Sequence, residues 1–358
     1  MVEMRKKYLL ILSSIIFFAV IAPVFSHSLL YLGVNETFSN FKTSQLTEQN
    51  DIVIIDDLPG SFTNWTWAKD QGYCTGTGTV VDPYIISDIF FNTSTYSYNC
   101  LTIINSRKYF VIEDCLFKGS HSWAGVELDN TTNGLIQSNQ LYPLTGALVW
   151  IFNSSLNEIN NNNASAGFWY GIIMDGGPGL SRLNIIRDNL ISFNLDIGIY
   201  LLGSSINNQI LRNTIYNNSD GIVMISSANN NTIHSNMIRD NSYGIEITTD
   251  YNTIYKNCFI NNGLHAIDDG VSNKWDNGLN GNYWDNYTGS DNNNDGIGDI
   301  PHNISGSAGS KDNYPLIECP LISEEAIPGY FLLIIYLTGI TMTMGIIYIK
   351  LKKKINIK

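Results

Sequence analysis

The sequence has 358 residues, enough to bury a sizeable core. Charged residues make up only 15%, apolar residues make up 44% in a regular pattern, and the formal net charge is −12. The patterning excludes a disordered chain, and the acidity argues against nucleic acid as a partner, because phosphate binding needs Lys and Arg.

The N-terminus has the pattern of an export signal. Arg5, Lys6 and Lys7 precede an uncharged apolar run over residues 8–25, and small residues follow at the spacing of a cleavage site. We therefore predict a signal peptide over residues 1–26, with an uncleaved anchor as the alternative because the run is nearly long enough to span a bilayer. Both interpretations place the next residues outside the cytoplasm.

Residues 27–79 are interpreted as a linker and an N-terminal cap. Residues 51–55 have the character of a strand, and Trp65 and Trp67 follow them. The Gly-rich run at 72–78 lacks the G-x-x-x-x-G-K-[ST] pattern, and no helix follows it. It is therefore interpreted as a turn into the first repeat and not as a phosphate loop.

Residues 80–268 repeat one phrase, N-x-I-x-x-N-x-I, a polar turn, and then G-I-x-I. The G-I-x-I markers lie 21 to 27 residues apart and begin at Cys100, Gly125, Gly146, Gly171, Gly198, Gly221 and Gly244. The second Asn position recurs with nearly the same period, at Cys115, Asn139, Asn162, Asn189, Asn213, Asn236 and Asn257. This period with short alternating strands predicts an all-β fold, a right-handed parallel β-helix of about eight coils. The L-x-x-L-x-L pattern of a leucine-rich repeat is absent from these phrases.

The alternation also assigns the two faces of each strand. Ile233, Ile238 and Ile245 are predicted to point inward, and the repeated Asn is predicted to form a ladder that stops at Cys115. Outward columns contain an apolar stretch over four coils, formed by Leu148, Trp150, Ile173, Tyr200 and Leu202. Either residues 51–75 or 275–290 cover this patch, or it is a platform that binds a sugar or a partner.

The segment 269–327 is predicted to hold an aromatic cap, an Asp-rich loop and a stalk. Oxygen-bearing side chains and one backbone carbonyl occur at the spacing of a calcium loop, at Asp291, Asn293, Asp295, Ile297 and Asp299. An EF-hand would need Glu where this chain has His302, so we predict a structural calcium loop with Asp312 as a further candidate ligand. The alternative is an Asx-rich turn without metal.

The C-terminus is predicted to anchor the chain. Residues 328–350 include a run long enough to span a bilayer, and the basic tail at 351–358 places this end in the cytoplasm. The five cysteines have no C-x-x-C pair, which excludes a zinc site of that type. We interpret them mostly as single buried thiols, with one or two disulfides as the alternative.

The coils, together with the sequences at 281–287 and 312–316, resemble the NosD-like proteins of the pectin-lyase-like superfamily over about residues 80–318. That resemblance implies a parallel β-helix and, through the family name, copper. The chain does not support copper, because His121, His234, His265 and His302 are scattered.

Members of the superfamily cleave polysaccharides, and hydrolysis requires two carboxylates that face one groove. The catalytic candidates are Glu127, Asp129 and Asp175; the last two share an outward column two coils apart. A G-H-G motif like that of polygalacturonases is absent. We therefore predict a membrane-anchored extracellular protein that binds carbohydrate or a surface partner without catalysis. A polysaccharide lyase or hydrolase and a structural envelope spacer are the alternatives.

Overall fold

The structure is a computed structural model that describes residues 46–119, 123–143 and 145–321. Its coils belong to one compact unit that ends at Cys319. Within the described residues, no helix is long and apolar enough to cross a membrane. The predicted signal peptide at 1–26, the predicted span at 328–350 and the basic tail lie outside the described residues.

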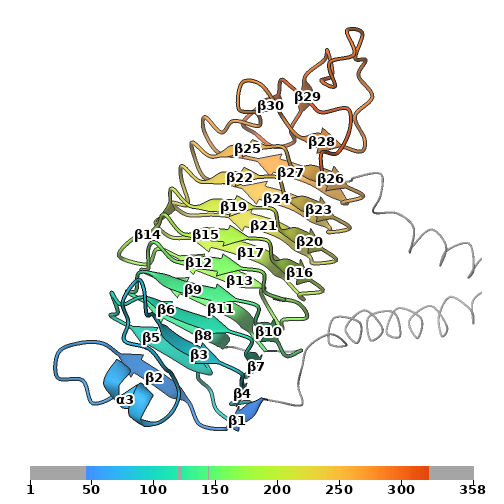
Figure 1. Ribbon diagram of the computed structural model, residues 1–358. Coiled ribbons are helices and arrows are strands. Elements are labelled where there is room, and N and C mark those ends of the chain that lie inside the picture. The colour runs from blue at the N-terminus through green and yellow to red at the C-terminus, as the bar shows by residue number, and fades with distance from the viewer. Residues whose placement is uncertain (1–45, 120–122, 144, 322–358) are drawn as a thin grey trace, which may run out of the picture. The chain divides into compact units, whose positions relative to one another are not determined.

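The chain winds into a parallel β-helix of the predicted right-handed type, with about eight coils stacked from the N-terminal to the C-terminal end (Figure 1). Most coils add one short strand to each of three faces; on the third face the coil that contains Asn163 contributes only isolated bridges, so that face is divided into two sheets. The nine-stranded sheet consists of β2 (Val53–Asp56), β5 (Leu101–Ile104), β8 (Ala124–Asp129), β11 (Ala147–Phe152), β13 (Ile172–Asp175), β17 (Ile197–Leu202), β21 (Asp220–Met224), β24 (Tyr243–Ile247) and β27 (Leu264–Asp268).

The other two faces are built in the same way. The eight-stranded sheet consists of β3 (Tyr84–Ser87), β6 (Phe110–Glu113), β9 (Gly134–Gln137), β12 (Glu158–Asn160), β15 (Ile185–Arg187), β19 (Gln209–Leu211), β22 (Thr232–His234) and β25 (Thr253–Tyr255). The third face consists of β1 (Thr47–Gln49), β4 (Ile89–Asn92), β7 (Leu116–Lys118) and β10 (Gln140–Leu141), then β16 (Leu190–Ser192), β20 (Thr214–Tyr216), β23 (Met237–Arg239), β26 (Cys258–Ile260) and β28 (Tyr283–Trp284). A short pair, β14 (Ser181–Arg182) and β18 (Ser205–Ile206), lies at one corner.

The core is a stack of identical side chains. The central residue of each strand in the eight-stranded sheet pairs with its copy in the next coil, and all of these residues are fully buried: Ile86, Ile112, Ile136, Ile159, Ile186, Ile210, Ile233 and Ile254. Burial of one such side chain stabilises the fold by about 2 kcal/mol. The predicted inward positions Ile238 and Ile245 are likewise fully buried.

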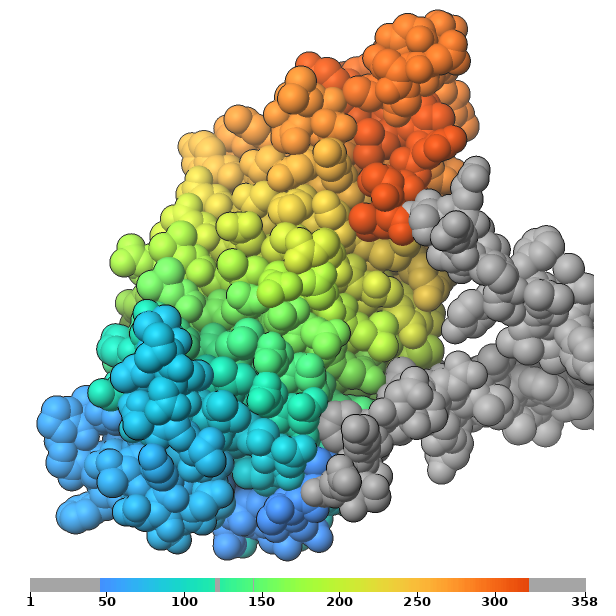
Figure 2. All heavy atoms as spheres, in the orientation of Figure 1, coloured from blue at the N-terminus to red at the C-terminus, as the bar shows by residue number. Residues whose placement is uncertain are grey.

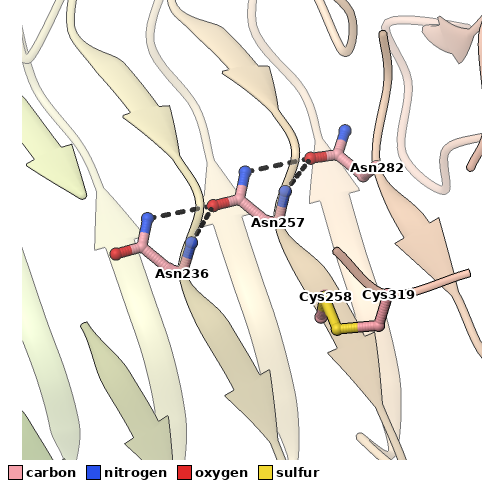
Figure 3. Close-up of a disulfide and its surroundings, with 5 residues drawn as sticks. All are labelled: Asn236, Asn257, Cys258, Asn282 and Cys319. Carbon is pink, nitrogen blue, oxygen red and sulfur yellow. Dashed lines mark hydrogen bonds between the residues drawn. A yellow bond between two sulfur atoms is a disulfide. The ribbon is translucent and has the colours of Figure 1, made fainter. Parts of the chain in front are cut away.

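Asn side chains line the corners of the coils in three ladders. The predicted ladder runs from Asn139 to Asn282, and it ends where the Cys115 amide, without a side-chain amide beside it, donates to Asn139. Figure 3 shows three of its rungs, at Asn236, Asn257 and Asn282. Two further ladders occupy the other corners, one from Asn157 to Asn273 and one from Asn194 to Asn262.

Each ladder Asn except Asn282 follows a residue in the left-handed region. In the predicted ladder, Ser235 precedes Asn236 with a φ of 56°, and Arg212 precedes Asn213 with a φ of 53°. This conformation turns the chain by a sharp angle, and the Asn that follows satisfies the backbone groups that the turn leaves without sheet partners. The corners, more than the strands, therefore fix the period of the coil.

The N-terminal end of the stack is closed by aromatic packing. Helix α3 (Trp65–Asp70) begins at Asn64, whose side chain accepts from the Trp67 amide. Trp65 is buried, stacks on Tyr84 with ring centroids 4.5 Å apart, and donates to Ser106. Strand β2, just before the helix, adds the first rung of the nine-stranded sheet.

The C-terminal end is closed by the segment that was predicted as an aromatic cap. Trp284 stacks on Phe259 at 4.3 Å, and Trp275 donates to the buried Asp268. The antiparallel pair β29 (His302–Asn303) and β30 (Lys311–Asp312) follows. The last described residues lie back along the upper coils, as the red atoms of Figure 2 show.

A disulfide joins this segment to the stack. Cys258 on β26 is bonded to Cys319, whereas Cys74, Cys100 and Cys115 are buried free thiols (Figure 3). Burial raises the pKa of the Cys100 and Cys115 thiols to about 12, so they stay protonated and inert. The described residues thus contain both buried free thiols and a disulfide, the two alternatives that the sequence allowed.

Candidate functional site

The outward face of the nine-stranded sheet carries the predicted patch, with one correction to its register. Trp150 pairs with Glu127 and Ile173, and Phe152 pairs with Asp129 and Asp175. The marker at Gly146 is therefore two residues out of register: Leu148 takes the Gly position of its coil and donates its amide to the Gly171 carbonyl. The prediction that Leu148 faces outward is wrong, because its side chain is fully buried.

The corrected columns follow the strand pairing. The first is Ile54, Thr102, Glu127, Trp150, Ile173, Tyr200, Val223, Glu246 and Ile267, and the second is Asp56, Ile104, Asp129, Phe152, Asp175 and Leu202. Four of the five predicted ligand-binding residues, Trp150, Ile173, Tyr200 and Leu202, therefore stand together on this face.

These residues line a surface pocket of about 220 Å³, called here the aromatic pocket. Its walls contain three Trp and two Tyr side chains together with one carboxylate. The lining residues are Trp123, Ala124, Gly146, Ala147, Trp150, Trp169, Tyr170, Ile173, Asp175, Tyr200 and Leu202. The segments 51–75 and 275–290, proposed as covers from the sequence, instead supply the cap elements β2, α3 and β28 at the ends of the stack.

The walls that the sequence did not predict come from corner loops. The amides of Trp169 and Tyr170 both donate to the Gly146 carbonyl, and the Gly146 amide donates to the Trp123 carbonyl. These bonds tie three successive corners together beside the sheet. The Tyr170 and Tyr200 rings lie 5.3 Å apart, so loop and strand meet in the pocket.

Gly171, directly after this wall, allows its coil to pack closely against the next coil and the core. A Cβ atom at Gly171 would lie 2.6 Å from the Gly198 carbonyl oxygen and 2.7 Å from the Ile191 side chain, so the backbone leaves no room for one. The Trp150 indole N–H is buried and has no hydrogen-bond partner among the described residues. Trp150 therefore contributes its ring surface, and not a donor, to this face.

The three candidate carboxylates border the pocket region. Asp175 lines the pocket, and its Oδ1 accepts from the Gly177 amide at 2.7 Å. Glu127 is half-buried and accepts from the Asn99 side-chain amide at 2.6 Å. Burial, with a contribution from Asp129, raises the pKa of Glu127, and burial also raises the pKa of Asp129.

A second acidic group lies on the other side of the pocket. The Asp196 amide donates to the Trp169 carbonyl, which fixes Asp196 beside the wall. Burial raises the pKa of Asp196, and burial together with Glu246 and Asp196 raises the pKa of Asp220 to about 6. Within the part of the chain that the structure describes, the Asp220 Oδ1 atom is buried without a hydrogen-bond partner.

The Asp-rich loop bonds to itself. The Asp291 carboxylate accepts from the amides of Asp295 and Gly296, and Asp295 accepts from the amide of Ile297. Asn293 Oδ1 also accepts from the Asp295 amide, and Asp299 accepts from Asn292. Asp312 is not part of this loop: it is fully buried and accepts from the Asn282 amide and the Trp284 indole.

Comparisons with known proteins identify the fold family. The profile of the NosD family, described as periplasmic copper-binding protein, matches residues 85–220 and 179–289, which together span more than half of the chain. The periplasmic description agrees with the predicted export of the bulk of the chain. A comparison with curated protein sequences gives no match.

Solved structures with a similar fold include three described as follows. Pectate lyase Pel9A is 14% identical over 79% of this chain and 83% of its own, with a TM-score of 0.38. A double mutant of the periplasmic alginate epimerase AlgG is 15% identical over 58% of this chain and 65% of its own, with a TM-score of 0.37. The Dettilon tailspike protein is 14% identical over 67% of this chain and 56% of its own, with a TM-score of 0.40. This chain thus spans less than two thirds of the epimerase variant and of the tailspike.

The described residues do not fit the copper in the family description. They contain no group of three or more His, Cys, Asp and Glu side chains that could hold a metal ion. The described histidines of the coils and cap have other partners: His234 stacks on Tyr255, His265 bonds to Asp285, and His302 stacks on Trp284.

Proposed function

The chain belongs to the NosD family, and from this premise and the site geometry we propose that it binds carbohydrate through the aromatic pocket. The observation that carries the proposal is the convergence of Trp123, Trp150, Trp169, Tyr170 and Tyr200 on one outward face. The C–H faces of a sugar ring are apolar and weakly positive, and aromatic faces are apolar and negative, so the two surfaces are complementary.

The size of the pocket favours one unit of a longer chain. Its volume of about 220 Å³ is below the roughly 300–1,000 Å³ of sites that enclose a whole drug-sized ligand. The outward columns continue along the nine-stranded sheet on both sides of it. A polysaccharide would therefore place one residue in the pocket and the next residues along the sheet.

A glycan-array screen of the full-length protein tests the proposal. Trp150→Ala and Tyr200→Ala should each weaken binding at least about tenfold, because each removes a stacking ring from the centre of the site. Tyr109→Ala removes a partly exposed ring before β6, away from the pocket, and should leave binding unchanged. If no glycan is bound, the carbohydrate proposal fails and the spacer interpretation gains support.

A second candidate function, glycoside hydrolysis, is favoured by the spacing of Asp129 and Asp175. They lie on either side of Phe152 in one column, so their backbone positions are about 10 Å apart at the strand spacing of about 4.8 Å. Inverting hydrolases hold their carboxyl groups roughly 6.5–9.5 Å apart. Cleavage of a bound glycan that disappears in Asp175→Asn would establish this function over simple binding.

We also propose that the C-terminal segment 328–350 anchors the protein in the membrane. The support is the uncharged run followed by Lys350 and the basic tail. Extraction of membranes at alkaline pH should leave the full-length protein in the pellet and release a variant truncated after residue 321. Release of the full-length protein would contradict the anchor.

A further inference from the structure

We propose that the aromatic pocket selects cationic sugar units, that is, amino sugars with a protonated amine, over neutral and uronic acid units. This inference rests on the proposed function, carbohydrate binding at the same pocket. It adds the chemical class of the ligand. The evidence for it is that acidic and basic side chains lie on different faces of the β-helix.

The nine-stranded sheet that bears the pocket has no Lys or Arg in any of its described strands. It does contain six carboxylates outside the core, which are Asp56, Glu127, Asp129, Asp175, Asp220 and Glu246, whereas Asp268 is fully buried and bonded to Trp275. Its one histidine, His265, is buried and bonded to Asp285. A ligand on the outward side of this sheet therefore meets acceptors and negative charge, and no cation from the strands.

Two basic side chains of the neighbouring coils, Arg187 and Arg239, lie on other faces and are already paired, and Arg182 is exposed on β14 at a corner, outside the nine-stranded sheet. Arg187 on β15 forms ion pairs with Glu158 and Asp188. Arg239 on β23 forms an ion pair with Asp240 and lies over the Tyr216 ring. These cations are therefore not available to bind the carboxylate of a uronic acid in the pocket.

The carboxylates surround the pocket on the sheet. Asp175 lines it directly, and Asp196 is held beside its wall by the bond between the Asp196 amide and the Trp169 carbonyl. Glu127 stands next to Trp150 in the first column, on the N-terminal side. Asp220 lies on the C-terminal side, one coil beyond Tyr200. A charged ligand in the pocket would therefore be near carboxylates on both sides.

The aromatic walls favour the same charge. An ammonium group over the face of Trp or Tyr is attracted by the ring quadrupole, and Trp is the strongest of the aromatic side chains in this respect. Three Trp and two Tyr rings converge here. An anion would be repelled by both the ring faces and the carboxylates, whereas a protonated amine gains from both.

The carboxylates also repel one another in the absence of a cation. Asp196 and Glu246 both raise the pKa of Asp220, and Asp129 raises that of Glu127, beyond the effect of burial. A bound ammonium group would offset this repulsion, so binding of an amino sugar should lower the electrostatic energy of these carboxylates.

The test compares oligomers of equal length on the full-length protein by titration calorimetry at about pH 6, where Asp220, with its pKa raised to about 6, is about half ionised and acids of ordinary pKa are ionised. The probes are oligomers of glucosamine, of N-acetylglucosamine and of galacturonic acid. We expect the glucosamine oligomer to bind at least about tenfold tighter than its acetylated counterpart, and the galacturonic acid oligomer to bind most weakly.

Variants that remove a carboxylate charge distinguish the preference for a cationic sugar from carbohydrate binding itself. Asp175→Asn keeps an acceptor for the Gly177 amide, and Asp196→Asn keeps the size of its side chain. Each should reduce the affinity for the glucosamine oligomer several-fold more than the affinity for the acetylated oligomer. Asp70→Asn, an exposed change at the end of α3, should alter neither.

Equal or tighter binding of the acetylated or galacturonic acid oligomer would overturn the cationic preference and leave carbohydrate binding standing. A preference that survives in both Asp175→Asn and Asp196→Asn would also overturn it. Absence of binding to all three oligomers and to the glycan array would instead overturn the proposed function itself.

Discussion

Replacing Asn236 by Asp exchanges one nitrogen for one oxygen in the middle of the central ladder. The Asn236 Nδ2 group donates to Asn257 Oδ1 at 2.9 Å, to the Ile210 carbonyl at 2.9 Å and to the His234 carbonyl at 3.1 Å. Its Oδ1 atom accepts from the amide and the side chain of Asn213. The side chain is fully buried, so Asp would face three acceptors without water.

The expected loss of stability in Asn236→Asp follows from the loss of hydrogen-bond donors and the burial of a charge. An uncompensated buried charge costs about 3–5 kcal/mol, and an unsatisfied buried acceptor about 1–3 kcal/mol. We expect Asn236→Asp to lower the free energy of unfolding by about 3–5 kcal/mol at neutral pH. Protonation restores one donor, so the pKa of this carboxyl is raised in the folded state above its unfolded value of about 3.9.

The sign of the pH dependence follows from that raised pKa. The folded protein binds the proton more tightly, so the variant is least destabilised below about pH 4 and loses stability as the pH rises through the folded pKa. Urea unfolding of wild type and variant at several pH values measures the difference. Asn161→Asp, an exposed change in a corner, should cost little at any pH. A buried variant as stable as wild type at neutral pH, or a loss that does not depend on pH, would refute the ladder account.

Four further predictions follow from other residues. Cys319→Ser should lower the free energy of unfolding by about 4 kcal/mol, because the disulfide no longer restricts a 61-residue loop in the unfolded chain. Reductant should destabilise only the wild type, and equal melting temperatures of wild type and variant without reductant would contradict this. Asp220→Asn should stabilise the fold by about 1 kcal/mol at neutral pH, after allowance for solvent screening. Because the pKa of Asp220 is raised, wild type loses stability as the pH rises from about 4 to 6, so the gain of the variant should vanish as the pH falls through the same window. A gain that grows in acid would contradict this. Leu183→Asn should stabilise by about 0.5–1 kcal/mol, since Leu183 is exposed with a φ of 58°, whereas the exposed Leu195, outside that region, should gain nothing. If the loop at 291–299 binds calcium, as its sequence predicts, calcium should raise the melting temperature of wild type and not that of Asp291→Ala, and an unchanged wild-type midpoint with chelator would count against calcium.

The fold was predictable because the same physical constraint recurs in every coil. Ile233 has copies above and below it, so the inward positions and the period could be counted without knowing any contact. Two of the three ladders were not predicted, although Asn231, Asn236 and Asn241 stand five residues apart, at the interval between corners. That spacing within the coil was the signal for all three.

The site was only partly predictable because it depends on how the coils deviate from the repeat. Counting by G-I-x-I put Leu148 on the wrong face, since Gly146 imitates the marker two residues early and only the strand pairing reveals it. Trp169 and Tyr170, which were not predicted, stand directly before the Gly171 marker, and this departure from the repeat was the signal that could have revealed the wall of the pocket. Trp123 gave no comparable signal, because its place in the wall depends on the path of a corner loop.

The most direct test of the account is the position of a bound oligosaccharide in a crystal structure of the protein. The account predicts a sugar ring between the side chains of Trp150 and Tyr200, with its amine toward Asp175 or Asp196. A sugar bound elsewhere on the β-helix, with the aromatic pocket filled only by water, would contradict it.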